Sequence, residues 1–242
     1  MLFVSSLLAG PWAALVFSLA GFPAATPLPA SPSPARLRMQ PVAARVYMPV
    51  GLAAAAGSAP NGLLIQTRKG LLLVDAAWSA PETEQLLRWA ADSLHQRVRV
   101  LFLTHARAAT PEALAVLHRH HVRLYSTPLT ARRWHSAHPQ APPLVPALKP
   151  YTLIRAGHTR LELFFPGARA TADKGVAWLP RQKVLFGGEL AQVPPPGSAA
   201  ASRAAWAASV RMVTARYPRA RVVIPARGPV GTLALLAPGR RR

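Results

Sequence analysis

"VLFLTHARAATPEAL", residues 100–114, joins the end of one expected element to the start of another. Its leading apolar run, Val100 to Leu103, is typical of a buried strand. A helical pattern begins at Pro111, and Glu112 falls in its first turn, where a carboxylate suits the helix dipole. His105 lies at the junction, in the kind of loop where α/β proteins place chemistry. The segment therefore predicts a strand–loop–helix unit with one histidine at a candidate functional position.

Strands and helices alternate on both sides of this unit. Apolar and β-branched patterns predict strands over 44–50, 98–104, 122–127 and 221–228, and hairpins over 61–77, 151–167 and 175–190. Helical spacing predicts helices over 79–96, 111–121, 128–138 and 202–218, and a short C-terminal helix after the last strand. Ser79 is the candidate N-cap of the first helix. This β-α-β-α-β order favours an α/β fold with a parallel or mixed sheet and helices packed on it.

The chain divides by composition into four parts. With 242 residues, 51% of them apolar, residues 43–235 are long enough for one α/β domain. Residues 1–25 carry no charge and resemble a signal peptide or an N-terminal membrane anchor, which predicts an exported, periplasmic or extracellular protein; a misplaced start codon is the alternative. Residues 26–42 are rich in proline and serine and predict an unstructured linker, and residues 236–242 form a basic tail.

The charge balance is strongly basic. Lys and Arg number 29 against 8 Asp and Glu, a formal net charge of +21. The basic residues are scattered, with dense runs only at 216–221 and 240–242, and no aromatic stacking motif or other specific nucleic-acid motif accompanies them. The charge thus predicts at most non-specific contact with polyanions or a membrane surface, and an arginine-rich coding bias explains it equally well. The chain has no cysteine, which excludes disulfides and thiolate metal ligands. Separately, we expect the protein to be a monomer.

Short motifs spread from about Val46 to Gly231 resemble those of metallo-β-lactamases, closest to the dizinc (class B) subclass that uses one cysteine ligand. The matching pieces are Asn61-Gly62-Leu63-Leu64, Leu73-Val74-Asp75 with Trp78, Phe165-Pro166-Gly167, Trp178-Leu179-Pro180, Val184-Leu185-Phe186-Gly187-Gly188, Arg216-Tyr217-Pro218 and Val222-Val223-Ile224-Pro225. The resemblance implies an αββα sandwich: two mixed sheets face to face, helices on the outer faces and a metal site at one sheet edge. It also implies structural roles for Asp75 and Asp173, which would brace neighbouring loops.

The same resemblance implies where the zinc ligands would lie. The family's first loop, Thr-His-x-His-x-Asp, corresponds here to Thr104-His105-Ala106-Arg107-Ala108-Ala109. The six ligand positions are occupied by His105, Arg107, Ala109, Ala170, Glu189 and Arg227. Only the first keeps the family's residue, and Gln192 replaces the lysine that would bind the substrate carboxylate.

These replacements are unsuited to zinc. A catalytic zinc needs about three protein ligands. Alanine offers no lone pair, and arginine stays protonated and carries only donors. We therefore expect no cofactor, with zinc retained only if His105 and Glu189 preserve part of the ancestral site. The sequence predicts a degenerate metallo-β-lactamase-like protein whose ancestral β-lactam hydrolysis is lost.

Three alternatives stay open. The chain could still be a hydrolase with a rearranged site, in which His105 and Glu189 act as base and partner. It could be a binding module that uses Arg107 and Arg227, placed near Glu189, for a small anionic ligand. It could also be a decayed gene product without a selected function. The paired histidines at 118 and 121 and at 135 and 138 are interpreted as surface residues, because no acidic residue lies within a turn of them.

Overall fold

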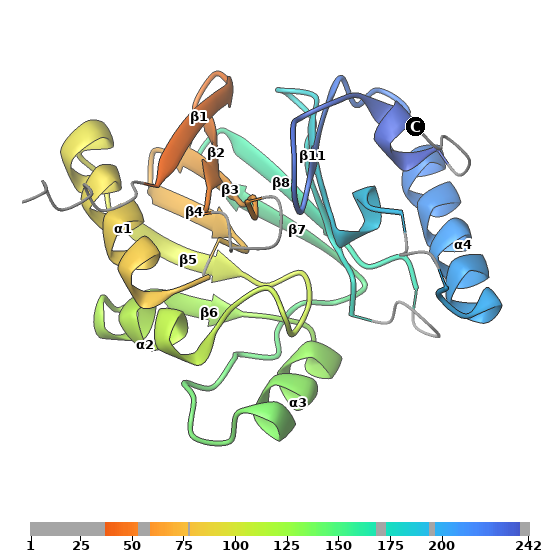
Figure 1. The fold of residues 1–242 in the computed structure, drawn as a ribbon. Helices are drawn as coiled ribbons and strands as arrows, with labels where there is room; N and C mark the ends of the chain where they lie inside the picture. Colours follow the sequence, from red (N-terminus) through yellow and green to blue (C-terminus); the bar gives the residue numbers. More distant parts are fainter. Residues whose placement is uncertain (1–36, 53–58, 77, 168–172, 194–196, 238–242) are drawn as a thin grey trace, which may run out of the picture. The chain divides into compact units, whose positions relative to one another are not determined.

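The computed structural model describes residues 37–52, 59–76, 78–167, 173–193 and 197–237 (Figure 1). All of them belong to one unit of the chain, Ala35–Arg242. The signal peptide or anchor expected over residues 1–25 lies outside the described residues. In the part of the chain that is described, no helix combines the length and the apolar character needed to cross a membrane.

The first sheet has six strands in the order β1-β2-β3-β4-β5-β6. These are β1 (Arg38–Ala43), β2 (Val46–Val50), β3 (Leu63–Thr67), β4 (Gly70–Val74), β5 (Val98–Phe102) and β6 (Arg123–Tyr125). Strands β1 to β4 pair in antiparallel fashion, whereas β4, β5 and β6 are parallel. The sheet is therefore mixed, as the order of elements predicted.

The second sheet has five strands in the order β11-β10-β9-β8-β7. These are β7 (Tyr151–Ala156), β8 (Thr159–Phe164), β9 (Val176–Leu179), β10 (Val184–Gly188) and β11 (Val222–Pro225). All neighbours are antiparallel except β10 and β11, which are parallel because α4 connects them. The two hairpins expected over 151–167 and 175–190 are both present.

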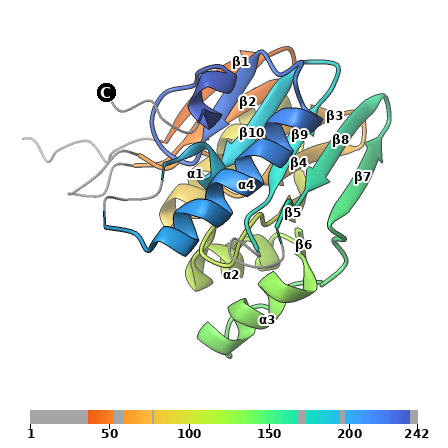
Figure 2. The same cartoon turned by 90° about the vertical axis from the view of Figure 1, so that its right-hand side faces the viewer.

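Helices cover the outer face of each sheet (Figures 1 and 2). The helices α1 (Ala80–Leu94), α2 (Pro111–Arg119) and α3 (Pro128–Ala137) contribute to the hydrophobic cluster on the first sheet. On the second sheet, α4 (Ala200–Arg216) packs with the short 3₁₀ turns η1 (Glu189–Ala191) and η2 (Leu233–Leu236). The αββα sandwich expected from the sequence is confirmed.

Alternating side chains along the central strands explain their continuous apolar character. In β4, Leu72 and Val74 face the core between the two sheets, whereas Leu71 and Leu73 face the helices. In β5, Val100 and Phe102 face the inter-sheet core and Leu101 faces the helices. Because both faces are buried there, β4 and the second half of β5 lack the apolar–polar alternation of a half-exposed strand.

Two expected boundaries are wrong. Residues 38–42 were expected within the linker 26–42, yet they belong to β1, an edge strand paired with β2. Pro41 is compatible with this place because an edge strand leaves one row of backbone donors unused. At the other end, Leu236 was assigned to the basic tail but is fully buried in the α4 layer. Both boundaries are set by contacts between segments: β1 pairs with β2, and Leu236 packs in the α4 layer. Local composition does not record such contacts.

Candidate functional site

Asp75 connects the ends of β4 and β5. Its Oδ1 accepts a hydrogen bond from the Thr104 backbone N–H at 2.9 Å, and its Oδ2 accepts one from the Thr104 hydroxyl at 2.7 Å. The residue is buried and has a φ of 54°, a left-handed conformation that aspartate tolerates better than most residues. Burial raises the pKa of the Asp75 carboxyl, while the charge of His105 and the Thr104 hydrogen bonds act against this shift. These contacts agree with the structural role expected for Asp75, which is to brace the neighbouring loop at Thr104.

His105 follows this pair and is itself buried, with 8% of its surface exposed. Its Nδ1 lies 3.1 Å from the Thr104 hydroxyl oxygen. The Thr104 hydroxyl donates to Asp75, so its oxygen can accept a hydrogen bond from His105 in the tautomer that carries a proton on Nδ1.

Arg107 and Arg227 line one cavity of about 530 Å³ at this edge, together with Trp78 and Ala109. Arg107 comes from the loop after β5 and Arg227 from the turn after β11. The second turn is held by the Asn61 side chain, whose Nδ2 donates to the carbonyl oxygens of Pro225 and Gly228, at 2.9 and 2.8 Å. The fold thus brings together two arginines that are 120 positions apart.

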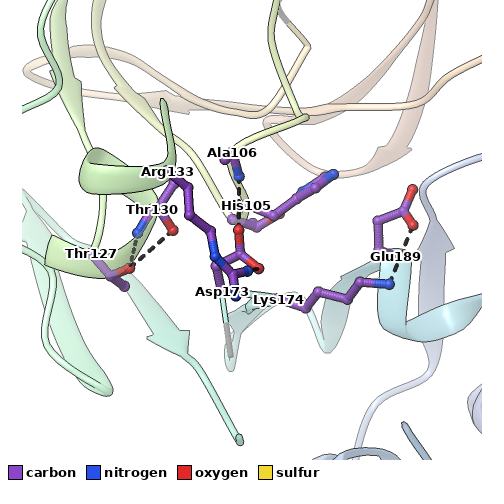
Figure 3. Close-up of polar contacts among 9 residues, drawn as sticks. His105, Ala106, Thr127, Thr130, Arg133, Asp173, Lys174 and Glu189 are labelled. Atoms are coloured by element: carbon purple, nitrogen blue, oxygen red, sulfur yellow. Dashed lines mark hydrogen bonds and ion pairs between the residues drawn. The ribbon is translucent and has the colours of Figure 1, made fainter. Parts of the chain in front are cut away.

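Glu189 is paired with a lysine that the sequence analysis did not single out. It begins η1, directly after Gly188 at the end of β10, and its Oε2 lies 3.6 Å from the Nζ of Lys174 (Figure 3). Lys174, from the loop before β9, therefore lies within ion-pair distance of the Glu189 carboxylate.

Asp173 braces the loop that carries the histidine. Its Oδ2 accepts a hydrogen bond from the Ala106 backbone N–H at 3.2 Å, and its Oδ1 pairs with Arg133 of α3 (Figure 3). The bracing role expected for Asp173 agrees with these contacts. Neither Arg133 nor Lys174 was a sequence candidate, because nothing in the local pattern marks a side chain whose partner lies 40 or 15 residues away.

The donor set at this edge does not fit zinc bound in the family's manner. Of the described ligand positions, His105 and Glu189 carry an atom that can coordinate a cation, and the second is already paired with Lys174. Ala109 lines the cavity without a donor, and Ala170 lies outside the described residues. Within the described ranges, no group of three or more His, Asp or Glu side chains is arranged to hold a metal ion.

Of the paired histidines, His118, His121 and His135 are exposed, and the neighbouring His120 has an acidic partner. His120 Nε2 is 3.4 Å from the Oε2 of Glu84 on α1, and the same carboxylate contacts Arg119. The sequence interpretation found no acidic neighbour for this group because Glu84 lies on another helix. The contact is partly exposed and links α1 to α2, as expected of surface residues.

Known proteins resemble the chain over most of its length. Metallo-beta-lactamase type 2 of Bacillus sp. (strain 170) is 32% identical over 180 residues, covering 73% of this chain and 69% of that protein. The type 2 enzyme of Bacillus cereus is also 32% identical, covering 73% and 70% of the two chains. Among solved structures, the metallo-beta-lactamase from Pontibacter korlensis has a TM-score of 0.72 and 30% identity, covering 83% of this chain and 95% of that one. No family model matches the chain.

The two facing sheets, their outer helices and the loops gathered at one sheet edge define an αββα sandwich protein. Sequence identity above 30% over more than two thirds of a relative's length is consistent with that architecture. The chain belongs to the metallo-β-lactamase family.

Proposed function

We propose that this family member has lost zinc-dependent β-lactam hydrolysis. The observation that carries the proposal is the chemistry of the ligand positions, where Arg107 and Arg227 are cations and Ala109 has no donor atom. A guanidinium repels a dication and stays protonated throughout the range in which proteins fold. Glu189, paired with Lys174, is a weakened candidate ligand.

The loss of the metal would remove the nucleophile. A zinc-bound water has a pKa near 7, far below the pKa of free water. The arginines at this edge can attract an anion, but they offer no coordination position in which a water could lose its proton. The Asp75–Thr104–His105 chain then serves the fold by satisfying buried polar groups.

Metal content and turnover test this proposal together. The purified full-length chain is dialysed against zinc, analysed for bound metal and assayed with a chromogenic cephalosporin in the presence of zinc. We expect substoichiometric zinc and no chelator-sensitive turnover, with His105→Ala behaving as the unaltered chain. Stoichiometric zinc together with turnover that the chelator and His105→Ala both abolish would overturn it.

A rearranged hydrolase is less well supported. It would need His105 Nε2 as base and Glu189 as its partner, and the described residues contain no hydrogen bond between these two side chains. Turnover that does not depend on metal and falls in both His105→Ala and Glu189→Gln would favour this alternative.

The second candidate function is binding of a small anion at the same edge. It is favoured by the cavity that Arg107 and Arg227 share, because a guanidinium binds carboxylates and phosphates through two parallel hydrogen bonds. Glu82 also lines this cavity, but its carboxylate is engaged by the Ser79 hydroxyl and by the Leu52 N–H. The lining therefore contains two arginines and one glutamate.

Titration calorimetry with acetate and with inorganic phosphate tests this candidate. We expect saturable binding that Arg107→Gln weakens and that Arg123→Gln, an exposed control on β6, leaves unchanged. Absence of heat with either anion, or equal losses in both variants, would exclude a specific site.

Export belongs to the same proposal. The uncharged residues 1–25 would direct the chain out of the cytoplasm or anchor it to the membrane. Fractionation of expressing cells, combined with mass determination of the mature N-terminus, tests this: a cytoplasmic protein that keeps residues 1–25 would contradict it.

A further inference from the structure

A second cationic cavity lies at the opposite end of β5 from the site described above. Its volume is about 690 Å³, and it is lined by Arg68, Lys69, Gly70, Ala91, His95, Gln96, Arg97 and Arg99. Arg97 and Arg99 flank the first residue of β5, whereas Arg107 follows its last residue. The two cavities are thus separated by the length of the strand.

The fold assembles this cavity from two segments. Arg68 and Lys69 form the turn between β3 and β4, and the parallel register of β4 with β5 pairs Leu71 with Val98. The turn and the start of β5 are therefore side by side. Gly70 fits here because a Cβ at this residue would meet the Cγ of Arg99 at 2.6 Å, so the missing side chain makes room for the arginine stem.

No carboxylate neutralises these cations. None of Arg68, Lys69, Arg97 and Arg99 forms an ion pair within the ranges that the structure describes, and the cavity lining contains no Asp or Glu. At the other end of the sandwich, by contrast, Lys174 is paired with Glu189. A concave surface lined by one sign of charge concentrates the electrostatic potential and attracts ions of opposite charge.

A neighbouring cavity extends the same surface. It has a volume of about 410 Å³, shares Arg68 with the first and adds Arg45 and Arg181 from two further turns. Arg160 also lines it and is paired with Glu162 at 2.9 Å. The positive surface therefore continues across the β3–β4 turn, over a distance that one monovalent anion would not fill.

We propose that this end of the sandwich is a binding site for a soluble oligophosphate, a ligand in which two or more phosphate groups are linked. Arginine forks match phosphate oxygens in bidentate fashion, and two adjoining cavities suit successive phosphates. No Phe, Tyr or Trp side chain lines either cavity, so the large aromatic platforms on which single-strand binders stack bases are absent there. None of the large apolar side chains exposed in the described residues lines them either, so nothing there would insert into a lipid surface.

Calorimetry with tripolyphosphate on the full-length protein at physiological salt tests the proposal. We expect saturable one-to-one binding that Arg97→Gln/Arg99→Gln weakens by roughly tenfold or more, because charge-assisted hydrogen bonds are lost. The matched control is Arg88→Gln/Arg211→Gln, which removes the same charge from exposed positions on α1 and α4 and should leave the affinity unchanged. Arg107→Gln should leave the affinity of this site unchanged, so any phosphate binding that it does weaken is assigned to the anion cavity at the other end.

Three results would overturn the proposal. Equal weakening in both double variants would show that net charge alone attracts the anion. Binding that does not saturate would exclude a defined site. Tight binding of duplex DNA or of vesicles containing anionic lipid, lost in Arg97→Gln/Arg99→Gln while tripolyphosphate does not bind, would assign the surface to a macromolecule instead.

Discussion

Asp75 shows how the fold itself can require a buried polar residue. Its carboxylate receives both the backbone N–H and the hydroxyl of Thr104, and Thr104 also contacts His105. Removal of the carboxylate would leave a buried N–H and a buried hydroxyl without their acceptor, which costs about 1–3 kcal/mol for each group. The requirement for Asp75 therefore comes from the fold.

The raised pKa of Asp75 predicts a pH dependence of stability. A carboxyl whose pKa is raised in the folded state binds its proton more readily there than in the unfolded chain. Its contribution to the free energy of unfolding therefore falls as pH rises above the ordinary value of 3.8. Urea denaturation of the unaltered protein and of Asp75→Asn between about pH 4 and 7 measures this. The difference in unfolding free energy between the two should decrease with rising pH, and an increase would show that hydrogen bonding outweighs burial.

At the scale of elements, three helices begin in the same way. Ser79, Thr110 and Thr127 each accept a hydrogen bond from a backbone N–H in the first turn, and a proline occupies one of the first two helical positions. These signals are local, since they depend on residues three positions apart. That is why the helix starts could be predicted from sequence to within a residue or two.

Ser79→Ala should lower the free energy of unfolding by about 1 kcal/mol. The Ser79 hydroxyl accepts from the Glu82 N–H and donates to the Glu82 carboxylate, which in turn holds the Leu52 N–H. The loss therefore affects the start of α1 and its contact with the segment after β2. Ser93→Ala, at an exposed position of the same helix, is the control and should have little effect. Chemical denaturation compares the two, and equal midpoints would show that the cap contributes nothing.

At the scale of the whole molecule, the basic residues have different surroundings at the two ends of the sandwich. At the zinc-site edge, Arg133 and Lys174 have carboxylate partners. At the opposite end, turns from both sheets present cations to two adjoining cavities with a single ion pair between Arg160 and Glu162. The same residue type thus braces loops at one end and leaves an attractive potential at the other.

The preserved framework predicts that the metal site can be rebuilt. The combined change Arg107→His, Ala109→Asp, Ala170→His, Glu189→Cys and Arg227→His would restore the ligand types that the family resemblance implies around His105. We expect stoichiometric zinc by elemental analysis, because the fold superimposes on a family structure with a TM-score of 0.72. The same chain with His105→Ala added should bind less zinc. Failure of the rebuilt chain to bind zinc while remaining folded would show that the loops, and not only the ligands, have changed.

The sequence determined the strands and helices and the residue types at most positions of the candidate site. Periodicity and capping gave the strands and helices, because both depend on neighbours a few residues apart. The motif resemblance gave the sandwich and the altered ligand positions, so His105, Arg107 and Glu189 were candidates before any geometry was known. Local composition gave the wrong prediction for β1, because its residues resemble a linker but pair with β2.

Only the tertiary structure decided which charges meet. Lys174 reaches Glu189, Arg133 reaches Asp173, and Arg68 lies beside Arg97, although each pair is separated in sequence by 15 to 40 residues. Ion pairs and cavities depend on distances in space, which strand register and sheet packing set and which no local pattern records. The amino-acid order fixed which side chains could donate, accept or repel, and the fold fixed which of them lie within reach of one another.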